Sequence, residues 1–138
     1  MDVIAKFEKE NSLFLIEDVC DALGGKFDNK KLGTFGDIST YSFYPAHHIT
    51  LGEGGALATN DLSIYHAALS LRDWGRACFC RYNEQNSNGA CNNRFGFRYS
   101  GLPKDYDHKY TYTHIGYNLK PLDIQAAMGQ EQLKKLAG

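Results

Sequence analysis

The stretch Ser42-Phe43-Tyr44-Pro45-Ala46-His47-His48-Ile49-Thr50-Leu51-Gly52-Glu53-Gly54-Gly55 decides the fold of this chain. Residues 37–43 lead into it and are rich in β-branched and aromatic side chains, which predict a strand, and residues 56–59 predict another. The stretch itself carries a glycine-rich tetrad and His47. An imidazole has an ordinary pKa of about 6.5 and suits proton transfer at neutral pH. We therefore expect a sheet in which the connection between these two strands contains functional residues.

The remaining sequence alternates between helical and extended patterns. Val3, Ile4 and Phe7 recur at helical spacing, and the apolar run at residues 13–16 predicts a short buried parallel strand. Asp18 follows at the C-terminal end of that strand, the edge where ligands gather in open α/β sheets. Two further helices are expected, one from Asn60-Asp61 to Gly75 and one after Pro121 with an apolar stripe of Leu122, Ala126, Gly129, Leu133 and Leu136.

Residues 76–118 have a different character, because asparagine, glycine, tyrosine and cysteine dominate and no helical or strand period persists. Loops of this length are usually functional or disordered, and the many aromatic side chains argue against disorder. We expect an irregular, ordered excursion.

Length and composition limit the class of protein. The chain has 138 residues, 43% of them hydrophobic, which allows one modest domain with a core. Its formal charge of −1, with acids and bases interspersed, gives no reason to expect a nucleic-acid partner. The first ten residues are too charged for a signal peptide, and no apolar run is long enough to span a membrane. We expect a cytoplasmic protein with no membrane partner.

The stretch at residues 42–55 resembles the DegT/DnrJ/EryC1/StrS sugar aminotransferases, vitamin B6 enzymes with the aspartate aminotransferase fold. Ser42, Phe43 and residues 52–55 match the family pattern. The resemblance implies an α/β fold, part of the large domain of the fold-type I PLP-dependent transferases, with a mixed, mostly parallel sheet and flanking helices. Because family chains are much longer, residues 1–138 are expected to be a central part of that domain, without its N-terminal part or the C-terminal small domain. Such a piece alone is expected to be inactive.

His47 stands where the family keeps the lysine that holds pyridoxal phosphate (PLP) as an imine. An imidazole forms no stable imine, so the resemblance implies a cofactor that is held noncovalently, as pyridoxamine 5'-phosphate (PMP). His47 is then the expected catalytic residue, free to move protons.

The resemblance also implies cofactor-binding roles for four other residues. Asp18 would pair with the protonated pyridine nitrogen, which keeps the ring an electron sink. Asp21, which replaces a glutamine common in the family, would contact the ring hydroxyl, and Ser42 would bind the phosphate. Asn118 would reach the phosphate in the partner subunit's site, so a homodimer is expected.

The four cysteines form a second pattern. Cys20, Cys78, Cys80 and Cys91 are separated by 57, 1 and 10 residues. In a cytoplasmic setting such a set favours a metal site over disulfides, and the Cys78–Cys80 spacing is too tight for a typical zinc pair. Four thiolates suffice for a 2Fe-2S cluster.

This combination of histidine and four cysteines resembles one branch of the family, the iron–sulfur C3 dehydrases of CDP-linked 4-keto-6-deoxyhexoses. The first cysteine gap matches that branch, and the last is longer here, an extension that an Asn/Gly-rich loop absorbs at small entropic cost. Arg72-Asp73-Trp74-Gly75-Arg76 and Tyr106-Asp107-His108-Lys109-Tyr110-Thr111-Tyr112 match as well. The branch implies a flavin and iron–sulfur reductase as partner and a place in the biosynthesis of 3,6-dideoxyhexoses of lipopolysaccharide O-antigen.

Three alternatives remain open. A cluster-free GDP-4-keto-6-deoxymannose 3-dehydratase also uses a histidine but needs no cysteine quartet. A nucleotide-sugar aminotransferase would show an imine band that borohydride removes. The chain could also be an inactive fragment or a structural metal-binding module.

Overall fold

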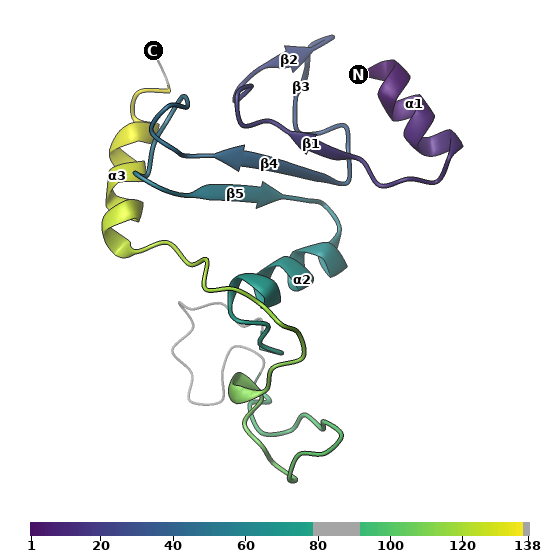
Figure 1. Ribbon diagram of the computed structural model, residues 1–138, viewed down its shortest axis with the longest axis vertical. Helices are drawn as coiled ribbons and strands as arrows, with labels where there is room; N and C mark the ends of the chain where they lie inside the picture. Colours follow the sequence, from purple (N-terminus) through teal and green to yellow (C-terminus); the bar gives the residue numbers. More distant parts are fainter. Residues whose placement is uncertain (79–91, 137–138) are drawn as a thin grey trace. The chain divides into compact units, whose positions relative to one another are not determined.

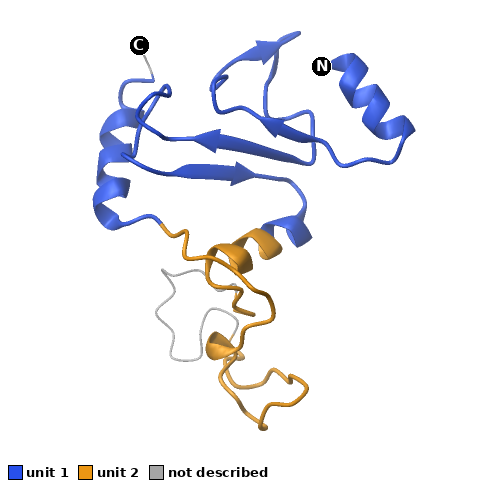
Figure 2. Ribbon diagram, in the orientation of Figure 1, with its two compact units in different colours: residues 1–65, 121–138 blue, residues 66–120 orange. Residues whose placement is uncertain are grey.

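The computed structural model describes residues 1–78 and 92–136 and divides into two compact units (Figures 1 and 2). Unit 1 contains Met1–Tyr65 and Pro121–Gly138, and unit 2 contains His66–Lys120. We describe each unit by itself.

Unit 1 is built around a three-stranded sheet in the order β1-β4-β5 (Figure 1). Strand β1 (Ile16–Asp18) pairs in parallel with β4 (Ile38–Ser42), with Asp18 opposite Thr40. Strand β5 (Gly55–Ala58) pairs antiparallel with β4, with Ser42 opposite Gly55. The predicted strands at 37–43 and 56–59 are confirmed, and the sheet is mixed, with one parallel and one antiparallel pairing.

The connection from β1 to β4 contains a small hairpin of β2 (Lys26–Phe27) and β3 (Lys30–Lys31). Its two turn residues, Asp28 and Asn29, have φ angles of 51° and 60°, which short polar side chains tolerate and which suit a two-residue hairpin turn. The buried side chain of Glu17 holds the residues between the hairpin and β4 in place by hydrogen bonds. Its carboxylate accepts hydrogen bonds from the backbone N–H groups of Gly33, Phe35 and Gly36 at 2.6 to 2.8 Å.

Two helices complete unit 1. Helix α1 (Asp2–Glu10) forms where Val3, Ile4 and Phe7 recur at helical spacing, and Asn11 is its C-cap. Helix α3 (Asp123–Leu133) begins two residues after Pro121, and the backbone N–H of Leu122 donates to Oε1 of Gln125 at 2.7 Å. Gly129 is buried in α3, and a Cβ at this position would lie 2.4 Å from Cδ2 of Leu51, so a larger residue would push the Leu51 side chain of the β4–β5 connection aside.

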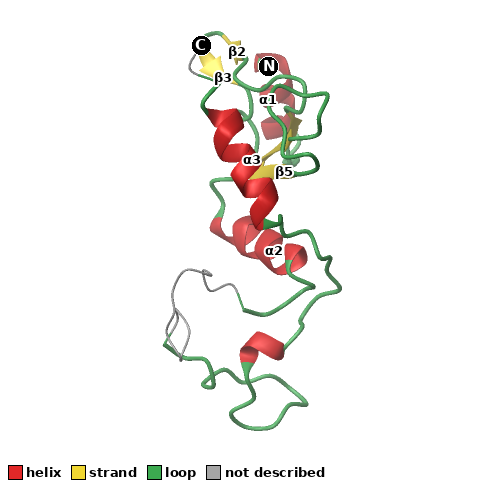
Figure 3. Ribbon diagram, turned by 90° about the vertical axis from the view of Figure 1, so that its left-hand side faces the viewer, coloured by secondary structure: helices red, strands yellow, loops and turns green. Residues whose placement is uncertain are grey.

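Unit 2 contains few regular elements, as Figure 3 shows by the extent of its loops. Helix α2 (Leu62–Arg72) spans the boundary between the units, and a short 3-10 helix follows at His108–Tyr110. The predicted irregular excursion is thus confirmed within the described residues. Helix α2 stops before the predicted Gly75 because Asp73 pairs with Asn118 in an isolated bridge and the following Trp74 has a φ of 61°.

The apolar core is smaller than the composition led us to expect. Among the described residues, Val19 and Ile49 are the only hydrophobic side chains that are buried. The prediction of a buried strand at 13–16 is wrong here: β1 begins at Ile16, and Phe14 and Ile16 are 77% and 60% exposed. The reason is that these side chains project away from the backbone pairing of β1 with β4, and no helix of the described residues packs on β1 closely enough to bury them. The stripe of α3 is likewise exposed at Leu122, Leu133 and Leu136.

None of the helices in the described ranges is long and apolar enough to cross a membrane.

Candidate active site

The parallel pairing of β1 and β4 brings three predicted site residues to one edge of the sheet. Asp18 ends β1 and Ser42 ends β4, and parallel strands finish at the same edge. Asp21 follows three residues after Asp18. Both carboxylates are exposed at this edge.

Asp18 is held as an ionised carboxylate. Its Oδ1 accepts hydrogen bonds from the backbone N–H of Cys20 at 3.2 Å and from the hydroxyl of Thr40 at 3.3 Å. The pKa of Asp18 is lowered, first by a hydrogen bond from the Cys20 thiol, then by the Cys20 backbone, Thr40 and the nearby His47. The same thiol contact raises the pKa of Cys20. An anionic group that faces solvent at a strand end can hold a cationic ring nitrogen.

His47 reaches this edge from the β4–β5 connection. Its Nδ1 lies 2.9 Å from Oδ1 of Asp21, and the His47 side chain is 19% exposed against 91% for Asp21. An ionised carboxylate only accepts hydrogen bonds, so Nδ1 carries the proton in this pair and Nε2 of a neutral ring is left as the base. The ring of Tyr44 contacts the imidazole edge-on, with centroids 6.3 Å apart.

The loop that carries His47 is closed by its own backbone. Leu51 N–H donates to the carbonyl oxygen of Phe43 at 2.9 Å, and Phe43 N–H donates to that of Gly54 at 2.8 Å. The φ angle of Gly54 is 153°, and a Cβ on Gly55 would lie 2.7 Å from the carbonyl oxygen of Tyr41. The glycine-rich tetrad is therefore needed to bring the loop back onto β4.

Ser42 has a hydroxyl that can still donate. Its Oγ accepts the backbone N–H of Tyr44 at 3.2 Å, which orients the side chain and leaves the hydroxyl hydrogen available. Together, Asp18, Ser42 and His47 offer an anion, a donor and a base, which fits a cofactor with a pyridine nitrogen, a phosphate and a carbon acid.

The remaining predicted site residues are Asn118 and the four cysteines, of which Cys20 contacts Asp18. Asn118 and Cys78 belong to unit 2, and Asn118 is exposed. Cys80 and Cys91 lie outside the described residues. Cys20 and Cys78 are free, half-buried thiols. Within the described part of the chain, no cluster of three or more histidine, cysteine or acidic side chains could hold a metal.

One functional neighbour escaped the sequence reasoning, and one residue beside the site has a structural role. Thr40 supports Asp18, and its position two residues before Ser42, on the same face of the strand, was a usable signal. Glu17 precedes Asp18 but serves the fold, because successive residues of a strand point to opposite faces.

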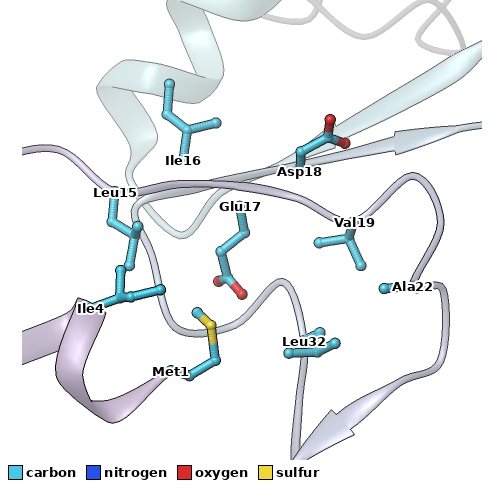
Figure 4. Close-up of a pocket in the computed structure, with 9 residues that line it drawn as sticks. All are labelled: Met1, Ile4, Leu15, Ile16, Glu17, Asp18, Val19, Ala22 and Leu32. Carbon is cyan, nitrogen blue, oxygen red and sulfur yellow. The ribbon is translucent and has the colours of Figure 1, made fainter.

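Figure 4 shows this division around a cavity of about 280 Å³: Glu17 and Val19 point toward it, whereas Asp18 points to the other face of β1. Asp18 contributes to the lining of this cavity, although its carboxylate points away from it. The residues that line the cavity are Met1, Ile4, Leu15, Ile16, Glu17, Asp18, Val19, Ala22 and Leu32.

Comparison with known proteins gives a family match and several relatives. The model of the DegT/DnrJ/EryC1/StrS aminotransferase family matches residues 1–138. The chain is 51% identical over 136 residues to a dTDP-4-dehydro-2,6-dideoxy-D-glucose 3-dehydratase of Saccharopolyspora spinosa, covering 99% of this chain and 29% of that protein. It is 50% identical to the lipopolysaccharide biosynthesis protein RfbH of Salmonella typhimurium, covering 96% of this chain and 30% of the relative. The chain thus spans about 30% of the length of these relatives.

A solved structure confirms the fold prediction. The Escherichia coli GDP-4-keto-6-deoxy-D-mannose-3-dehydratase with bound hydrated PLP superposes with a TM-score of 0.74 at 33% identity, covering 99% of this chain and 32% of that one. The α/β fold is therefore that of the PLP-dependent aminotransferases.

Proposed function

Because the chain belongs to the DegT/DnrJ/EryC1/StrS aminotransferase family, we propose that it forms part of a PMP-dependent enzyme that removes the C3 hydroxyl of a nucleotide-linked 4-keto-6-deoxyhexose. The observation that carries this proposal is the contact between His47 and Asp21 in the loop where the family keeps its lysine. A paired imidazole is a proton carrier and not an imine former, which favours dehydration over amino transfer.

PMP, when bound, supplies an amine that condenses with the C4 ketone and a pyridinium ring that accepts electrons. The carboxylate of Asp18 would keep the ring nitrogen protonated, and the hydroxyl of Ser42 would donate to the phosphate. Nε2 of His47 would take a proton from the C4′ carbon and return it to the departing C3 hydroxyl, which leaves as water. Asp21 holds the imidazole of His47 in the tautomer with the proton on Nδ1, which leaves Nε2 free for this transfer.

We further propose that Cys20, Cys78, Cys80 and Cys91 hold a 2Fe-2S cluster, a group that passes single electrons. Support comes from Cys20 and Cys78, which are free thiols, and from the contact of Cys20 with Asp18, which would make cluster ligand and cofactor partner neighbours. The electrons would come from a flavin and iron–sulfur reductase. The expected substrate is CDP-linked, on the route to dideoxyhexoses of lipopolysaccharide.

A homodimer is part of the proposal. Asn118 lies in an extended segment where Ile115, Tyr117 and Leu119 are 98%, 66% and 65% exposed. Three exposed apolar side chains at alternate positions suit burial against a second copy, which would carry Asn118 to the phosphate of the neighbouring site.

The second candidate is a cluster-free GDP-4-keto-6-deoxymannose 3-dehydratase. An E. coli protein of that name is 35% identical over 98% of this chain. This candidate function uses His47 in the same role and gives the cysteines none. A nucleotide-sugar aminotransferase is the third candidate, and an inactive fragment is the fourth.

Iron and sulfide analysis separates the candidates. We expect about two iron and two sulfide per chain after anaerobic reconstitution of a protein that contains the whole aminotransferase-like domain. Loss of iron in Cys78→Ser, with the PMP spectrum unchanged, would support the cluster. An iron-free protein that still dehydrates its substrate would favour the second candidate, and an imine band reducible by borohydride would contradict both.

A further inference from the structure

Tyr44 interacts with both residues of its loop that have a role in the proposed function, Ser42 and His47. Its backbone N–H donates to Oγ of Ser42 at 3.2 Å, and its carbonyl oxygen accepts from the backbone N–H of His47 at 3.0 Å. Its ring lies edge-to-face with the imidazole of His47, with centroids 6.3 Å apart and an angle of 69° between the ring planes. The proposed reaction assigns no role to Tyr44 itself.

The hydrogen bond to Asp21 does not fix the orientation of the His47 imidazole by itself. The Asp21 side chain is 91% exposed, so water competes for its oxygens, whereas the His47 side chain is only 19% exposed. A single hydrogen bond at Nδ1 also restrains rotation about χ2 only weakly, because this type of torsion has broad minima. It follows that a group other than Asp21 covers the imidazole and restrains its plane.

The ring of Tyr44 has the position and the geometry for this restraint. Aromatic rings with centroids about 4.5 to 7 Å apart favour an edge-to-face arrangement. The Tyr44 side chain is 49% exposed, so packing into the apolar core does not account for its place. Within the residues that the structure describes, the Tyr44 hydroxyl has no hydrogen-bond partner. The ring and not the hydroxyl therefore makes the interaction with His47.

We propose that Tyr44 is a positioning residue for proton transfer by His47. The Tyr44 ring restrains the plane of the imidazole while Asp21 holds Nδ1, and together they fix the direction in which Nε2 points. This inference rests on the proposed function, because Tyr44 acts through the base that the proposed function assigns to His47.

Solvent-deuterium exchange at the C4′ carbon of PMP tests this role in a protein that contains the whole aminotransferase-like domain. Tyr44→Leu removes the ring and keeps both backbone hydrogen bonds. We expect exchange about two- to tenfold slower in this variant, with an unchanged dissociation constant for PMP. Tyr44→Phe keeps the ring and should exchange at the wild-type rate.

Phe27→Leu is the matched control for the loss of an aromatic pair. Phe27 and Phe35 form an edge-to-face pair of nearly the same geometry in the β1–β4 connection, with centroids 6.2 Å apart and an angle of 72°. Because this pair does not include His47, the control should leave the exchange rate unchanged.

A second measurement does not depend on the reaction. NMR relaxation of the ¹³C-labelled His47 ring, in the same protein without PMP, reports how firmly the imidazole is held. The order parameter of the ring should fall in Tyr44→Leu and stay at the wild-type value in Tyr44→Phe. If wild type showed no exchange while the order parameter still fell in Tyr44→Leu, the proposed function would fail and the restraint by Tyr44 would stand.

Four results would overturn the role of Tyr44. Two of them are a wild-type exchange rate and a wild-type order parameter in Tyr44→Leu. The third is an equal loss of exchange in Tyr44→Phe and Tyr44→Leu, which would assign the effect to the hydroxyl. The fourth is an affinity for PMP that falls in step with the exchange rate, which would show a general disturbance of the loop.

Discussion

Nδ1 of His47 lies 2.9 Å from Oδ1 of Asp21, although the two residues come from different segments of unit 1. The aspartate was expected at the cofactor ring hydroxyl; the structure brings it to the histidine. Because a carboxylate both orients an imidazole and stabilises its protonated form, this pair is suited to repeated proton transfer.

We predict that Asp21→Asn slows proton transfer by His47 about tenfold or more. The amide can still occupy the site, but it does not stabilise the imidazolium. The measurement is solvent-deuterium exchange at the C4′ carbon of PMP in a protein with the whole domain. Asp28→Asn, which replaces an exposed turn residue in the hairpin, is the matched control. Equal exchange rates in wild type and Asp21→Asn would refute the role.

His47→Asn should abolish C4′ proton exchange while PMP still binds, since the phosphate and pyridine contacts come from other residues. Absorption spectroscopy follows binding, and NMR follows exchange. His48→Asn changes the neighbouring exposed histidine and should exchange like wild type. If the His48 variant loses exchange and the His47 variant keeps it, the assignment is reversed.

Glu17→Gln should lower the free energy of unfolding by about 2–3 kcal/mol. The carboxylate accepts three backbone N–H groups, and a glutamine replaces one acceptor oxygen by a donor that faces them. Chemical denaturation measures the change. Glu8→Gln at α1 serves as a comparison, and a similar loss in both variants would speak against a specific role for Glu17.

Acid stability of unit 2 should depend on Asp107. Its pKa is lowered, first by the hydrogen bond from Arg94, whose Nη2 lies 2.6 Å from Oδ2. A carboxyl whose folded pKa is depressed stabilises the fold above its unfolded pKa of about 3.9, and this contribution disappears as the pH falls toward the folded pKa. Melting temperatures of wild type should therefore drop below about pH 4. Asp107→Asn should have a lower melting temperature than wild type at pH 7, and its melting temperature should fall less as the pH is lowered. Parallel plots of melting temperature against pH for the two proteins would contradict this prediction.

Gly116→Ala should destabilise unit 2. A Cβ there would lie 2.2 Å from the backbone nitrogen of Gly75, where two chain segments cross. Gly101→Ala meets no atom within 4 Å and carries only the strain of a φ of 82°. The melting temperature should thus fall further for Gly116→Ala, and the opposite order would rule out the close crossing.

The sequence by itself determined the element types and the chemistry available. These are local features: the strand composition at 37–43, the helical spacing near Val3 and the histidine in the lysine position. They can be recognised in the sequence because periodicity and motif spacing act over a few residues. The irregular nature of residues 76–118 followed from composition alone.

Tertiary structure decided which groups meet. The parallel register places Thr40 on Asp18, and the fold of the β4–β5 connection brings His47 to Asp21. It also turned Glu17 to the face opposite Asp18 and left Leu13, Phe14 and Ile16 exposed. These outcomes depend on hydrogen bonds and packing between segments far apart in the chain, whose register no local pattern encodes.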